Sequence, residues 1–178
     1  MSRMKAAPQL PVFVWSVAGG CAFLATFLLR GAAAWAPLAV AVSVMLVFGL
    51  VRGGRIAAGI WAAALLIASA VVSVISVNSV IYYWVFVLVL AGACAGAAEP
   101  SNGRNRIVSG LAWAIALPIG LYAGIAAAIF LDQPLDLLFD RGFVAGRFIG
   151  GALGAAVAFL IGENVAALPV KTAVTSGH

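Results

Sequence analysis

Long uncharged apolar runs dominate this sequence, and the charged residues stand almost entirely between them. Ten basic and five acidic residues are spread over 178 positions, so that 8% of the residues are charged and 65% are hydrophobic. Globular domains carry roughly 25% charged residues, because a water-facing surface needs them. This composition excludes the soluble classes and predicts an all-α integral membrane protein. We expect residues 1–178 to form one compact multi-pass domain with short loops.

Six apolar stretches are long enough for transmembrane helices, which need about 20 apolar residues to cross roughly 30 Å of hydrocarbon. The run from Ile56 to Ala98 would extend roughly 65 Å as one helix, so it must turn back. The polar residues Ser76, Asn78 and Ser79 mark that turn, because short polar side chains can bond freed backbone groups. We expect spans at residues 11–29, 33–51, 56–77, 79–98, 107–130 and 144–165, and a short outer interfacial segment at residues 132–142.

Two alternatives reduce the number of spans. In the first, one hairpin is replaced by a tilted or re-entrant segment, which leaves five spans. In the second, Arg3 and Lys5 precede the core of a secretory signal, with a weak lipoprotein cleavage box before Cys21. Cleavage there would also leave five spans and would spoil the alternation of charge between the two sides.

The basic residues predict the orientation, because cytoplasmic loops of membrane proteins carry an excess of Lys and Arg. Six spans with a cytoplasmic amino terminus place seven of the ten basic residues inside: Arg3, Lys5, Arg52, Arg55, Arg104, Arg106 and Lys171. Tryptophans near the span ends are interpreted as aromatic belts, with Trp15, Trp61 and Trp113 at the inner side and Trp35 and Trp84 at the outer side. We expect both termini in the cytoplasm and the protein in a plasma or bacterial inner membrane.

Small residues recur at every fourth position of the last span, as in a glycine zipper: Gly142, Gly146, Gly150, Gly154, Ala158 and Gly162. Such a stripe lets another helix backbone approach closely. The main expectation is contact with a neighbouring helix of the same chain; a homo-oligomer contact or the docking of another membrane subunit is the alternative. A local echo of Val12-Phe13-Val14 at Val85-Phe86-Val87 indicates either an inverted repeat or a chance match between alanine-rich helices.

Two polar positions of the last span are candidate ligand or ion sites. Arg147 lies one turn inside the span. It either reaches the outer interface, near lipid headgroups or paired with Asp136 or Asp140, or it binds the carboxylate or phosphate of a small anionic solute. At the opposite end, Glu163 and Asn164 are either interfacial or, if embedded, a proton or cation site.

The fifth span adds two further candidates. Pro118 in its middle predicts a kink, because proline removes one backbone hydrogen bond, and Tyr122 follows as a residue that could line a cavity. Beyond this span, Asp132, Asp136 and Asp140 share one helical face, which is interpreted as a solvated acidic surface or as a cation attractor at a pore mouth.

Catalytic chemistry is not expected. The only histidine is His178, the sequence contains no metal-ligand, phosphate-loop or nucleophile motif, and Cys21 and Cys94 fall inside spans as packing residues. We therefore expect no enzyme activity, catalytic residue, cofactor or metal, and the dispersed basic residues argue against nucleic acid as a partner. The sequence favours transport, permeation or membrane capture of a small solute. The alternative is a non-catalytic accessory or assembly subunit of a membrane complex that docks through the glycine stripe.

Overall fold

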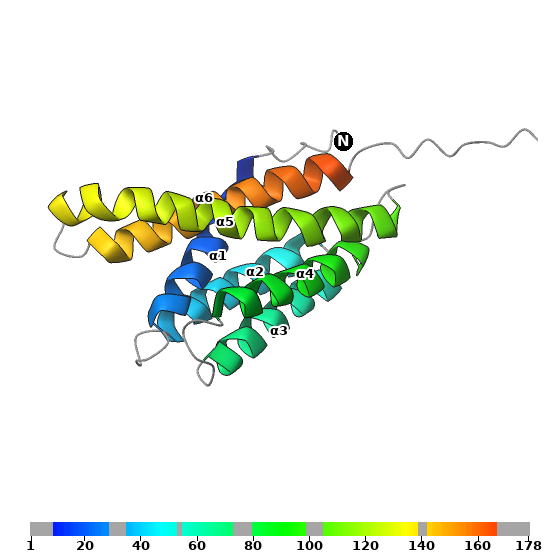
Figure 1. Ribbon diagram of the computed structural model, residues 1–178. Helices are drawn as coiled ribbons and strands as arrows, with labels where there is room; N and C mark the ends of the chain where they lie inside the picture. Colours follow the sequence, from blue (N-terminus) through cyan, green and yellow to red (C-terminus); the bar gives the residue numbers. More distant parts are fainter. Residues whose placement is uncertain are drawn as a thin grey trace, which may run out of the picture.

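The chain folds into helices joined by short connections (Figure 1). The computed structural model describes residues 9–28, 35–52, 55–72, 80–98, 105–138 and 142–166. These residues contain no β-strand and form six helices: α1 (Gln9–Leu28), α2 (Trp35–Arg52), α3 (Arg55–Val72), α4 (Val80–Ala98), α5 (Arg106–Leu138) and α6 (Gly142–Ala166). The predicted helical class and the order of the six helices are therefore confirmed.

The long apolar run is divided as expected, since α3 ends at Val72, α4 begins at Val80, and the two helices pack against each other. The residues predicted to form the turn, Ser76, Asn78 and Ser79, lie outside the described residues. Asn105 starts α5 as an N-cap, because its Oδ1 accepts a hydrogen bond of 2.9 Å from the backbone N–H of Ile107.

One predicted boundary differs from the structure. We expected the fifth span to end near residue 130 and a separate interfacial segment to follow, but α5 continues as one helix to Leu138. Pro134 lies within it, although proline removes one backbone hydrogen bond. In this region α5 packs against α6, because a Cβ added at Gly146 of α6 would lie within 4 Å of Asp132 and Leu135 of α5.

Two helices of the described chain are long and apolar enough to cross a membrane. They are the segment Arg106–Asp132 of α5, with a mean hydropathy of 2.2, and α6, with a mean hydropathy of 1.9. The described apolar segments of α1 to α4 are shorter. About a third of the most apolar window in each long helix is buried (33%), whereas the core helix of a soluble protein would be buried over most of its length.

The six helices close into a ring. Each helix packs against the next one in the sequence, and α6 returns to pack against α1. Figure 1 shows α5 and α6 side by side as a long pair, with α2, α3 and α4 on one side of it. Helices α5 and α6 run antiparallel, because Gly120 of α5 lies against Gly154 of α6 and Gly124 lies against Gly150.

Glycine makes the α5–α6 contact close, and this contact is the most extensive in the fold. A Cβ atom added at Gly150 would lie 2.6 Å from the carbonyl oxygen of Gly124 and 2.7 Å from the Cβ of Ala128. All six residues of the predicted stripe are buried. Because α5 covers this stripe, its small residues bring two helices of the same chain together.

A second small-residue face of α6 packs against α1. A Cβ at Gly20 would lie 2.8 Å from the carbonyl oxygen of Phe148, and a Cβ at Gly151 would lie 2.9 Å from the carbonyl oxygen of Gly19. Small residues on two faces of α6 therefore hold it between α5 and α1, and this is where the ring closes.

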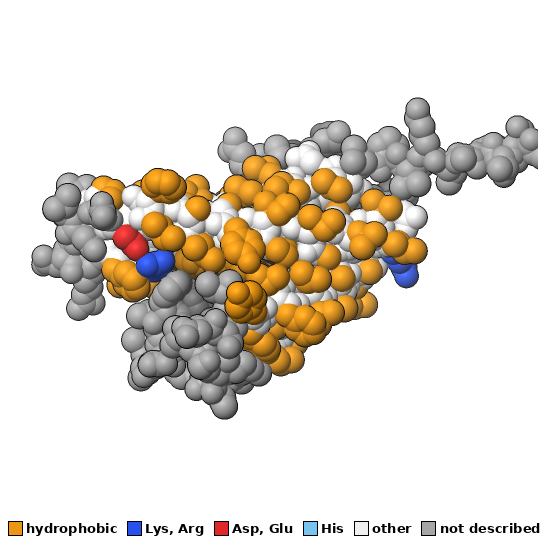
Figure 2. Space-filling view, in the orientation of Figure 1, with side chains coloured by type: hydrophobic (Ala, Val, Ile, Leu, Met, Phe, Trp, Pro, Cys, Tyr) orange, Lys and Arg blue, Asp and Glu red, His pale blue; other side chains and the backbone are white. Residues whose placement is uncertain are grey.

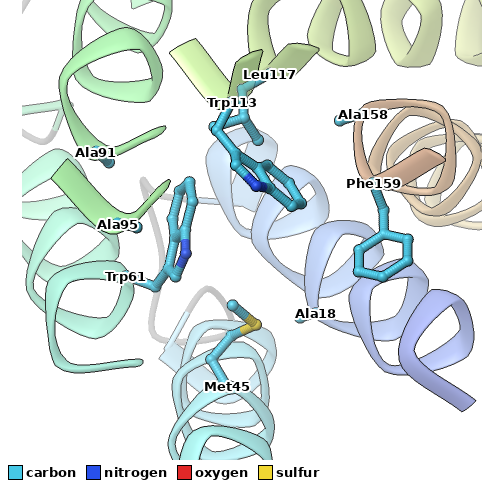
Figure 3. Close-up of a cluster of buried hydrophobic side chains, with 9 residues drawn as sticks. All are labelled: Ala18, Met45, Trp61, Ala91, Ala95, Trp113, Leu117, Ala158 and Phe159. Atoms are coloured by element: carbon cyan, nitrogen blue, oxygen red, sulfur yellow. The ribbon is translucent and has the colours of Figure 1, made fainter. Parts of the chain in front are cut away.

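The interior of the ring contains side chains from every helix (Figure 3). The buried cluster is composed of alanine, aromatic and other apolar side chains: Ala18, Met45, Trp61, Ala91, Ala95, Trp113, Leu117, Ala158 and Phe159. In Figure 3, Trp61, Trp113, Phe159 and Met45 point into the space between the helices. Ser109 is the one buried polar side chain among the residues for which burial is described.

The outer surface is also apolar. Figure 2 shows hydrophobic side chains over most of the described face, with a few charged atoms near its ends. One exposed row follows α5: Ile107, Leu111, Ile115, Ile119, Tyr122, Ile129 and Phe130. An apolar surface of this extent is typical of contact with lipid or with another protein.

Candidate functional site

An ion pair joins α5 and α6 near the connection between them. The Nη2 atom of Arg147 donates a hydrogen bond of 2.7 Å to Oδ2 of Asp132, and the two side chains are only 14% and 23% exposed. The prediction that Arg147 pairs with Asp136 or Asp140 missed this partner. Because α5 stays helical and runs antiparallel to α6, residue 132 lies level with residue 147. The side chains of Asp136 and Asp140 lie outside the described residues.

Two neighbours shape this ion pair. The guanidinium carbon of Arg147 lies 4.7 Å from the centre of the Phe143 ring, which is within the range of a cation–π contact. A Cβ at Gly146 would lie 2.8 Å from Oδ1 of Asp132, so glycine leaves room for the carboxylate. That oxygen is buried and accepts no hydrogen bond from the described residues. An external anion at Arg147 would have to compete with Asp132.

The polar residues at the other end of α6 form a separate site. Glu163 is partly buried, whereas Asn164 is exposed and donates a hydrogen bond of 2.7 Å to the carbonyl oxygen of Leu160. Residues 147 and 163 are roughly 24 Å apart along the helix. The structure therefore does not bring Arg147 and Glu163 into one binding site.

The two candidates in α5 lie in different environments. Pro118 is partly buried in the middle of the helix, which continues without a break on either side of it. Tyr122 is 54% exposed and shares the outer face of α5 with Ile115 and Ile119. It therefore lies away from the ring interior, where a cavity-lining residue would be needed.

The sequence did not predict an aromatic cluster in the ring, which we define as Trp15, Trp61, Trp113 and Phe159. Trp15 stacks on Trp113, with 5.0 Å between ring centroids and 24° between ring planes, and it meets Trp61 edge-on at 5.3 Å. Phe159 lies 5.9 Å from Trp15 and 6.0 Å from Trp113. These four residues come from α1, α3, α5 and α6, so the cluster joins helices that are distant in sequence.

This cluster corrects the interpretation of three tryptophans as belt residues at the membrane interface. Their positions along the helices matched such a belt, but Trp61 and Trp113 are only 8% and 4% exposed. Hydropathy gives the depth of a residue along a helix and not the face it occupies. One feature of the sequence could have indicated the cluster. Trp15, Trp61 and Trp113 have similar expected depths in their spans, which allows their rings to meet.

Trp113 is held in a slot between two glycines. A Cβ at Gly96 of α4 would lie 2.9 Å from Cδ1 of Trp113, and a Cβ at Gly162 of α6 would lie 2.9 to 3.0 Å from other atoms of the same ring. The Nε1 atom is buried and has no hydrogen-bond partner among the described residues. The ring is therefore fixed sterically while its one polar group stays unused.

No group of three metal-binding side chains occurs in the described part of the chain. Cys21 is buried, Cys94 is exposed, and both are free thiols. Comparison with protein-family models, curated proteins and solved structures finds no match. The helical ring, its aromatic cluster and the ion pair are thus the features from which a function can be inferred.

Proposed function

We propose that this protein is a six-span membrane protein that captures a small solute or lets it pass along the axis of its helical ring. The observation that carries this proposal is the closure of the ring, in which α6 packs against α1 and every helix contributes to a common interior. A ring of helices around a shared axis suits the passage of a solute, because no helix backbone crosses that axis. Only side chains then lie between one end of the ring and the other.

Helix lengths support six spans. The helices α1 to α4 contain 20, 18, 18 and 19 residues, which corresponds to roughly 27 to 30 Å and matches the thickness of the hydrocarbon layer. The apolar part of α5 is longer, at 27 residues or roughly 40 Å, and fits the same layer if it tilts by about 40°. Figure 1 shows α5 and α6 running at an angle to α3 and α4.

The polar groups at the two ends of α6 support a path between two aqueous sides. In the proposed orientation, with both termini in the cytoplasm, the Arg147–Asp132 pair lies at the outer end and Glu163 lies at the inner end. The aromatic cluster lies between them, one turn from Glu163, because Phe159 precedes that residue by four positions. A small anionic solute would first meet the guanidinium of Arg147 and compete with its internal partner.

Solute flux tests the proposal directly. We expect purified protein in liposomes to increase the entry of at least one class of small solute, anionic, neutral or cationic, measured by light scattering after osmotic shock. Protein-free liposomes give the background. Background flux for all three classes, together with no solute bound to protein purified from native membrane, would contradict the proposal.

An accessory or assembly subunit is the second candidate function. The observation that favours it is the close packing of the interior by alanine and aromatic side chains. Docking through the glycine stripe of α6 is not favoured, because α5 covers that stripe. The exposed row on α5 around Ile115 is one apolar surface open to a partner subunit or a second copy. A stoichiometric protein partner that crosslinks to this row would support the accessory role.

A further inference from the structure

Tyr122 is a polar residue on an otherwise apolar outer face. It is 54% exposed and lies in the exposed row on α5, next to Ile119. Between residues 107 and 131, two other side chains carry an N–H or O–H group, and both of these, Ser109 and Trp113, are buried in the fold. The Tyr122 hydroxyl has no hydrogen-bond partner among the described residues.

The depth of Tyr122 makes this hydroxyl costly in a membrane. The apolar segment Arg106–Asp132 contains 27 residues, and its middle lies near residue 119. At 1.5 Å per residue the backbone of Tyr122 is about 5 Å from this middle, whereas hydrocarbon extends about 15 Å on either side of the bilayer midplane. The difference of roughly 10 Å exceeds the length of a tyrosine side chain. The hydroxyl therefore stays among acyl chains, which offer it no hydrogen bond.

A second copy of the chain supplies a hydrogen-bond partner at this depth. Insertion gives every copy the same orientation, so two copies are related by a two-fold axis along the membrane normal. Each residue near the axis then meets its own counterpart. Because a phenol hydroxyl both donates and accepts, one Tyr122 can donate a hydrogen bond to the other.

The exposed row is straight and large enough for this contact. With roughly 200 Å² for a large side chain, exposed fractions of 45% to 82% leave about 900 Å² of the row uncovered. A stable interface buries about 800 Å² on each partner. From residue 115 to residue 129 the exposed positions follow at intervals of four, three, four and three residues, as along the seam of a parallel coiled coil: Ile115, Ile119, Tyr122, Ala126 and Ile129.

We propose that the exposed row on α5 is the contact between two copies of this chain in the membrane, with the two Tyr122 side chains paired at the two-fold axis. Tyr82 shows the difference that depth makes. It is 77% exposed but lies near the start of α4, where headgroups and water can bond its hydroxyl. The inference rests on the proposed crossing of the membrane by α5, and it adds a partner that solute passage does not require.

Dilution in lipid tests the inference on the unmodified full chain. Protein labelled at a carboxyl-terminal tag with a donor or an acceptor dye is reconstituted into phosphatidylcholine liposomes at decreasing protein-to-lipid ratios, and energy transfer gives the fraction of dimer. Tyr122→Phe keeps the ring and removes the hydroxyl. We expect it to associate about threefold more weakly, because one interhelical hydrogen bond in a membrane contributes about that factor. Tyr82→Phe is the matched control and should associate like the unmodified chain.

Crosslinking at single positions tests which face is in contact. In a background with both native cysteines replaced by alanine, Ile119→Cys should form a disulfide between two copies on oxidation, because a residue near the axis meets its own counterpart. Leu153→Cys on α6 is the control. Leu153 is 50% exposed, and it lies at nearly the same depth because the adjacent Gly154 faces Gly120. We expect it to stay monomeric after oxidation.

Four results would overturn the inference. They are a monomer at every protein density, equal association of the two tyrosine variants, equal crosslinking of Ile119→Cys and Leu153→Cys, and crosslinking of Ile119→Cys to a different protein in native membrane. The dilution of the unmodified chain needs no variant, so misfolding of a cysteine variant leaves the test intact. Failure here is distinct from failure of the proposed function, because solute flux in liposomes can be measured for a monomer as well as for a dimer.

Discussion

Gly150→Ala should weaken the contact between α5 and α6, because the added methyl group would meet backbone and Cβ atoms rather than a movable side chain. The new Cβ would lie 2.6 Å from the carbonyl oxygen of Gly124 and 2.7 Å from the Cβ of Ala128, whereas ordinary contact begins at 3.4 Å. The two helices would have to separate by about 0.7 to 0.8 Å. A gap of this size removes between a quarter and a half of the dispersion energy of each stretched contact.

The magnitude follows from a matched substitution on another helix. Gly59 of α3 is exposed and nothing lies within 4 Å of its added Cβ, so Gly59→Ala changes only the conformational freedom of the backbone. Both substitutions gain the same helix propensity. Overpacking costs about 1–3 kcal/mol, and we expect Gly150→Ala to be less stable than Gly59→Ala by that amount.

Unfolding of the two variants in mixed micelles with increasing sodium dodecyl sulfate, followed by circular dichroism, measures this difference. Size-exclusion chromatography before the titration checks that both variants start as the same species. Equal midpoints for Gly150→Ala and Gly59→Ala would refute the assignment of the glycine stripe to a close contact between α5 and α6.

Three further experiments test other parts of the structure. Ile115→Lys on the exposed face of α5 should cost about 2.5–3.5 kcal/mol of insertion free energy in a translocon assay if lipid surrounds this position, whereas a water-facing site would tolerate it within about 0.5 kcal/mol. A double-mutant cycle of Asp132→Ala and Arg147→Ala should give a coupling energy of about 1 kcal/mol in unfolding titrations, and zero coupling would argue against the ion pair. Trp15→Ala should lower the unfolding midpoint and increase solute flux in liposomes, while Phe13→Ala, at a 65% exposed position two residues earlier, should do neither; equal effects would contradict a central role for Trp15.

The sequence was sufficient to predict the helices, because their existence depends on composition and on length along the chain. The division of the run from Ile56 to Ala98 followed from the length of a helix alone. The extension of α5 through Pro134 was not predictable in this way, because Asp132 and Asp136 interrupt the apolar run from which the span was inferred.

The face of each helix that points into the ring was harder to predict, because it depends on contacts between helices. Each transmembrane-like helix is apolar on all sides, so no polar face indicates which side points inward. Trp15, Trp61 and Trp113 were therefore interpreted as belt residues on the outer faces of their helices, whereas their rings meet inside the ring of helices. Arg147 was recognised as unusual, but its partner Asp132 follows from the antiparallel register of two helices, which the spacing of charges does not encode.

The closure of the ring between α1 and α6 also has a consequence for synthesis. Gly19 and Gly20 belong to α1, yet their packing partners around Gly151 of α6 are synthesised roughly 130 residues later. At about 5 to 20 residues per second, that face of α1 waits about 7 to 26 s for its partner. During this interval α1 can pack only against helices already made, so α6 has to enter beside α1 after α2 to α5 have been synthesised.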